Sequence, residues 1–148
     1  MKRTDKSAYE KAAELLNYRM MSEGELEDKL LSRGYEAKEI SPAIERLREL
    51  GLLNDSEYAG AVVRSCARKG WGAARARQEL FRRKIPKELF DEALSELPED
   101  SSEAIMKYVS SHLKDPEDEA QVNKTVSGLL RRGFSFEEIR SALNESEK

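Results

Sequence analysis

The stretches "KLLSRGYEAKEISPAI" (residues 29–44), "ELFRRKIPKELFDEAL" (79–94) and "GLLRRGFSFEEIRSAL" (128–143) are three versions of one pattern. Each contains a leucine, an arginine three residues later, and an apolar residue two positions after that arginine. The leucines are Leu30, Leu80 and Leu129, which are 50 and 49 residues apart. A period of this length is typical of arrays of helical units.

Each unit contains the start and stop signals of three helices. In the first unit we expect a helix from Ala8 to about Arg19. Ser22 with Glu25 three residues later is a capping box, which indicates the start of a second helix. Gly34 stands where a helix end adopts left-handed backbone, which a residue without a Cβ tolerates best. The long helices leave little room for strands.

The third helix of the first unit contains a proline whose role the sequence leaves open. Apolar residues at helical spacing run from Ile40 to Leu50, and Gly51 ends the pattern. Either Pro42 kinks this helix, or Ser41 is its N-cap and Pro42 its first residue.

The middle unit repeats these signals. Asn54 with Glu57 is a second capping box, and the second helix is expected to begin after Gly72. Pro86 is expected to open the third helix.

The third unit follows the polar junction at residues 98–103, and Ser135 with Glu138 is its capping box. We therefore predict an all-α protein of three domains, residues 1–53, 54–98 and 99–148. Units of about 50 residues bury little apolar surface alone, so we expect neighbours to share cores in an elongated, curved array.

Charge is concentrated in the middle of the chain. The net charge is −3, yet residues 64–87 carry nine basic groups and one acid, for a net charge of +8. The segments before and after them have net charges of −3 and −8. This distribution predicts an anionic partner for the middle unit.

A helical wheel from Trp71 to Lys84 separates two faces. The expected buried face is apolar and consists of Ala73, Ala76, Leu80 and, extending it, Phe81. The expected outward face consists of Trp71, Arg75, Gln78 and Arg82. Trp71 either anchors a partner on this face or packs against the neighbouring unit.

The basic centre is therefore the candidate contact region for a protein or nucleic-acid partner. Its candidate residues are Arg64, Arg68, Lys69, Trp71, Arg75, Arg77, Arg82, Arg83 and Lys84.

Neither catalysis nor metal binding is indicated. Cys66 lacks a neighbouring base and is expected to pack in a helix, and His112 has no second metal ligand nearby. The acidic run at residues 115–119 lacks the spacing of a calcium loop and is expected to begin a helix. We expect no cofactor.

The longest uncharged apolar run, Tyr58 to Val63, is too short to span a membrane. One cysteine permits no internal disulfide, which favours the reducing cytoplasm. We also expect a monomer.

Two stretches resemble the RecX family. "LNYRMMSEGELEDKLLSRGY" (16–35) is similar to the signature of its first repeat, and "LRELGLLNDSEYAGAVVRSCARKGWGAARARQEL" (47–80) to its most characteristic block. The sequence departs from the family pattern at Ala76, where a branched aliphatic residue is usual, and at Lys84, where a glycine commonly ends the helix.

The resemblance implies three helical repeats and a regulator without enzyme activity, which binds the filament of the RecA recombinase and commonly suppresses it. The partner implied by the resemblance is the RecA filament, including the single-stranded DNA within it. Whether this chain inhibits or assists remains open from sequence. The alternative is direct DNA binding, because tandem three-helix units resemble helix-turn-helix modules.

Overall fold

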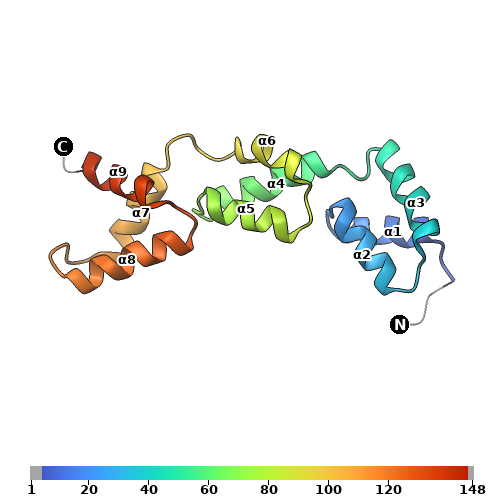
Figure 1. The fold of residues 1–148 in the computed structure, drawn as a ribbon, viewed down its shortest axis with the longest axis horizontal. Helices are drawn as coiled ribbons and strands as arrows, with labels where there is room; N and C mark the ends of the chain where they lie inside the picture. The colour runs from blue at the N-terminus through green and yellow to red at the C-terminus, as the bar shows by residue number, and fades with distance from the viewer. Residues whose placement is uncertain (1–4, 147–148) are drawn as a thin grey trace.

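The computed structural model describes residues 5–146, which form helices and no strands (Figure 1). The expected all-α fold is confirmed. The first group of helices is α1 (Ala8–Tyr18), α2 (Glu23–Ser32) and α3 (Ala37–Glu49). The second is α4 (Asp55–Arg68), α5 (Ala73–Arg82), the 3₁₀ turn η1 (Lys87–Leu89) and α6 (Phe90–Leu94). The third is α7 (Ser102–His112), α8 (Glu119–Arg131) and α9 (Phe136–Ser146).

Side-chain caps start several of these helices, as expected. Ser22 and Glu25 form both hydrogen bonds of a capping box at α2, and so do Ser135 and Glu138 before α9. Asn54 accepts from the amide of Glu57, which caps α4, but the reciprocal bond to the Glu57 carboxylate is not formed, so the predicted capping box is only half present. The acidic run at residues 115–119 supplies the N-cap of α8, because the carboxylate of its fourth residue accepts two helical amides.

Pro42 and Pro86 were expected to affect the third helices of their repeats, and they do so differently. Pro42 lies inside α3, which begins at Ala37, so Ser41 is not its N-cap. Pro86 precedes η1, as expected, but the third helix of the middle group is then broken into η1 and the five-residue α6. The middle repeat therefore has a much shorter third helix than its neighbours.

Each group of helices has its own hydrophobic core. Leu30, Leu80 and Leu129 are fully buried at equivalent positions, one in each core. No buried residue of the described chain belongs to more than one of the three clusters. The expectation of shared cores is wrong, because the neighbouring repeats meet through backbone and polar groups instead.

The second helices of the three groups follow one another along the long axis of the molecule (Figure 1). The Ser22 hydroxyl at the start of α2 donates to the carbonyl of Arg83 at the end of α5, with an O–O distance of 2.5 Å. At the start of α5, the amides of Gly72 and Ala74 donate to the carbonyls of Arg132 and Gly133, at 2.7 and 3.1 Å. Positive amino ends thus meet negative carboxyl ends, an arrangement that helix dipoles favour.

These end-to-end contacts require close backbone approach. A Cβ at Gly72 would lie 2.5 Å from the carbonyl oxygen of Gly133, and a Cβ at Gly133 would lie 2.6 Å from the Cβ of Arg75. The joint between the middle and third repeats therefore depends on two glycines.

Lys84 adopts the left-handed backbone that glycines adopt at the equivalent positions. Its φ is 60°, compared with 94° at Gly34 and 99° at Gly133. The lysine thus preserves the helix end at a conformational cost, and its ammonium group forms an ion pair with Asp28 of the first repeat.

We expect Lys84→Gly to be more stable than Lys84→Ala by about 1 kcal/mol, because both remove the ion pair but only glycine relieves the left-handed strain. Urea denaturation of the two variants measures this difference. Equal midpoints with equal slopes would contradict it.

Candidate functional site

Helix α5 presents its basic surface because its opposite face is fixed in the middle core. Ala76 and Leu80 are fully buried there, and Glu79 is buried beside them. The carboxylate of Glu79 lies 3.5 Å from the guanidinium groups of both Arg82 and Arg83. Glu79, the only acid among residues 64–87, is therefore turned toward the core. The charged side chains that α5 exposes to solvent are arginines.

Phe81 is 70% exposed on the outer side of α5. The expectation that it extends the buried face is wrong: at 3.6 residues per turn it lies about 140° from Ala76. Leu31, the equivalent residue of the first repeat, is also exposed. Sequence reasoning therefore missed the one large aromatic side chain that α5 offers to a partner.

An open groove of about 820 Å³ lies beside Phe81. Ile85 and Phe90 supply the rest of its apolar lining. We call it the Phe81 groove; its polar lining residues are Arg77, Gln78, Arg82, Lys84 and Lys87. It brings together three of the predicted contact residues, Arg77, Arg82 and Lys84.

Three other predicted residues lie at the joint with the third repeat. Trp71 precedes α5 and packs against the middle core. The guanidinium carbon of Arg75 lies 3.9 Å, and the ammonium nitrogen of Lys69 4.7 Å, from the centre of a Trp71 ring. Arg75 also donates to the carbonyl of Arg131 at 3.2 Å. The expected single face of Trp71, Arg75, Gln78 and Arg82 is therefore not formed. Trp71 packs inward against the core of its own repeat and lines the hollow at the joint, rather than anchoring on the outward face.

The remaining predicted residues, Arg64, Arg68 and Arg83, point elsewhere. Arg64 forms an ion pair with Glu96 at 3.3 Å. Arg83 donates to the hydroxyl of Tyr58 at 2.8 Å, at the joint with the first repeat. Arg68 is exposed at the end of α4 and has no ion-pair partner within residues 5–146. The nine predicted residues therefore do not form one patch. Some lie at the joints with the first and third repeats, some line the Phe81 groove, and Arg64 and Arg68 lie on α4.

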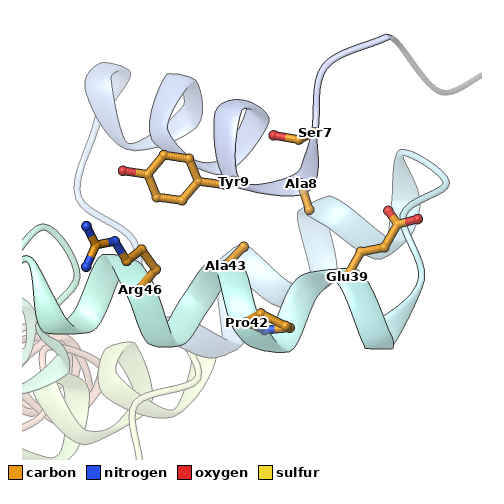
Figure 2. A pocket seen from close by; sticks show the side chains of 7 residues that line it. All are labelled: Ser7, Ala8, Tyr9, Glu39, Pro42, Ala43 and Arg46. Carbon is orange, nitrogen blue, oxygen red and sulfur yellow. The ribbon is translucent and has the colours of Figure 1, made fainter.

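Two further hollows lie elsewhere on the described part of the chain. One of about 420 Å³ lies at the joint with the third repeat and includes Trp71 and Phe134 in its lining. The other, of about 430 Å³, lies between α1 and α3, where Tyr9 and Arg46 extend along one side and Glu39 lies at the far end (Figure 2). Neither combines an exposed aromatic residue with a cluster of cations.

The cysteine and histidine occupy structural positions. Cys66 is buried in the middle core, as expected, and this burial raises the pKa of its thiol. His112 stacks on Tyr108 with ring centres 3.9 Å apart. Within the part of the chain that the structure describes, no three His, Cys, Asp or Glu side chains are grouped to hold a metal ion. No described helix is long and apolar enough to cross a membrane.

Two models of known protein domains match the sequence of this chain. The model of the first three-helix domain of RecX matches residues 8–47, and that of the second matches residues 54–94. The chain belongs to the RecX family. The resemblance seen in the sequence is confirmed, and the matched ranges contain the first two groups of helices.

Full-length relatives extend the RecX relationship beyond these two domains. The regulatory protein RecX of Vibrio vulnificus is 35% identical over 144 residues, which cover 94% of this chain and 92% of the relative. That of Xanthomonas axonopodis is 33% identical over 140 residues, covering 93% and 86%. The crystal structure of RecX from Lactobacillus salivarius superposes with a TM-score of 0.81 at 27% identity, over 93% of both chains. The chain therefore shares the fold of RecX regulatory proteins and aligns with these three relatives over most of their length.

Proposed function

We propose that this RecX family member binds the filament of the RecA recombinase and lowers its activity in recombination and DNA repair, as a monomer in the cytoplasm and without catalysis of its own. Support comes from the relatives, which are named regulatory proteins. The arrangement of α2, α5 and α8 in one row is the structural observation that favours it. A long body with basic charge at its centre suits the groove of a helical filament whose surface is anionic.

The proposed contact region is the predicted basic centre, with the Phe81 groove as its middle. Arg77 and Arg82 are exposed there. Arg68 is a separate exposed cation at the end of α4. Lys69, Trp71 and Arg75 contribute by fixing the neighbouring joint, which sets the angle between repeats.

Direct reading of duplex DNA has less support. A recognition helix places its amino-terminal residues against base edges. The amino end of α5 is covered by the turn of the third repeat, and α6, the third helix of the basic repeat, has only five residues. Neither α5 nor α6, the second and third helices of the basic repeat, thus offers a free amino end of sufficient length.

The proposal is tested by measuring binding of the full chain to three immobilised targets: recombinase filaments on single-stranded DNA with a non-hydrolysed ATP analogue, recombinase alone, and bare DNA. We expect filaments to bind at least ten times more tightly than bare DNA, and the chain to slow ATP hydrolysis by filaments. Equal affinity for bare DNA would favour direct DNA binding, and absence of filament binding would contradict the proposal.

A further inference from the structure

We propose that the Phe81 groove is the docking site for an acidic protein segment that inserts an aliphatic or aromatic side chain against Phe81. That the acidic segment belongs to the recombinase filament rests on the proposed function. That the groove binds an acidic segment is argued from its own residues and is independent of the proposed function. The groove itself is defined by the lining given above.

The apolar part of the groove is built to receive a side chain. Phe81 projects from α5 with 70% of its surface exposed, although Leu80 beside it is fully buried. Ile85 and Phe90 form the rest of the apolar lining, so the ring of Phe81 faces a hollow rather than open solvent alone. Aromatic residues at the centre of such hollows carry much of the energy of protein association.

The polar part of the groove selects an acidic occupant. Four of its eight lining residues are cations and none is an acid, and all eight belong to the described part of the chain. Two of the cations are partly compensated, Arg82 by Glu79 at 3.5 Å and Lys84 by Asp28. Arg77 and Lys87 have no ion-pair partner among residues 5–146. Carboxylates on either side of an apolar anchor would complement this rim.

A protein segment fits better than a nucleic acid strand. A single strand binds through a basic track that usually spans about 4–16 nucleotides, with bases stacked on aromatic rings. Here the excess of positive charge is confined to residues 64–87, and the flanking parts of the chain carry net charges of −3 and −8. A short acidic segment ends before it meets these flanks, whereas a long polyanion is repelled by them.

The groove also has the size for one or two large side chains. Its volume of about 820 Å³ lies within the range of small-ligand sites. An amphipathic helix presents such anchors three or four residues apart, with acids between them, and this is a common way for a helix to occupy a groove.

The test uses fluorescence anisotropy with three labelled probes: an amphipathic peptide with leucines at helical spacing and glutamates elsewhere, the same peptide with glutamine in place of glutamate, and oligothymidylate. We expect the full chain to bind the acidic peptide, and Phe81→Ser to weaken that binding at least tenfold. Arg77→Gln combined with Lys87→Gln should weaken it to a similar degree. Leu31→Ser is the matched control, since Leu31 is 46% exposed at the equivalent position of the first repeat.

Three outcomes would overturn the docking site: no binding of the acidic peptide, equal affinity of the glutamine peptide, or loss of oligothymidylate binding rather than peptide binding in Phe81→Ser. The same variants are assayed on recombinase filaments. Filament binding that survives without a Phe81-dependent peptide site refutes the groove alone. If the chain binds the acidic peptide through Phe81 but does not bind filaments, the proposed function is refuted and the docking site is not.

Discussion

Gly133→Ala is expected to open the joint between the middle and third repeats and to lower the free energy of unfolding by about 3 kcal/mol. Gly133 has a φ of 99°, and left-handed backbone costs a residue with a side chain about 1–2 kcal/mol. The new Cβ would also lie 2.6 Å from the Cβ of Arg75, and such overlap costs about 1–3 kcal/mol unless the backbone moves. Because each repeat has its own core, the third repeat should swing away before it unfolds.

Substitutions at two other glycines separate the effect of steric overlap from the effect of left-handed backbone strain. Gly72→Ala creates a contact of 2.5 Å with the carbonyl oxygen of Gly133, but Gly72 has an ordinary φ of −95°, so only overlap is introduced. Gly51→Ala introduces only strain, because Gly51 has a φ of 75° and nothing lies within 4 Å of its added Cβ. Gly51→Ala should therefore cost about 1 kcal/mol without a change of shape.

Guanidinium denaturation gives the free energies, and small-angle X-ray scattering gives the radius of gyration. The single tryptophan, Trp71, lines the hollow at this joint, so its fluorescence reports opening. We expect the scattering profile and the emission maximum to change in Gly133→Ala and Gly72→Ala, and to stay unchanged in Gly51→Ala. Identical profiles for all three would show that the glycine joint does not hold the repeats together.

The repeat and the helix starts were predictable because they depend on side chains. Period, apolar spacing and capping boxes place Leu30, Leu80 and Leu129 in equivalent cores and start α2 at Ser22. The joint between the middle and third repeats was not predicted, since its closest hydrogen bonds are made by backbone amides and carbonyls, which every residue has. Its trace in the sequence is the pair of glycines, Gly72 and Gly133, whose need for close approach appears only when distant segments meet.

The candidate surface was predicted in composition but not in geometry. Charge counting locates the basic repeat, yet it cannot distinguish Arg77, which lines a groove, from Arg83, which binds Tyr58 at a joint. Trp71 lies two residues before the first residue of α5, so a wheel that begins there gives it a helical direction that it does not have. Phe81 was misassigned because its neighbour Leu80 is buried, although one residue changes the direction on a helix by about 100°.

The arginines of the groove should dominate binding, so that Arg77→Glu with Arg82→Glu weakens binding to recombinase filaments about a hundredfold. Both side chains are exposed and line the groove, so reversal replaces attraction to an acidic partner with repulsion. A hundredfold change corresponds to about 2.8 kcal/mol, which is within the range of interfacial arginine hot spots. Arg75 is a poorer choice, since its guanidinium group stacks on Trp71 and its reversal would disturb the joint.

A matched control is Lys38→Glu with Arg46→Glu, which changes the net charge equally on exposed positions of the first repeat. Binding of both double variants is measured across a series of salt concentrations, with circular dichroism to verify the fold. The defect of the groove variant should shrink as salt rises, because the Debye length falls from about 10 Å at 0.1 M to about 3 Å at 1 M. Equal defects in both variants would mean that net charge, rather than the surface around Phe81, attracts the filament.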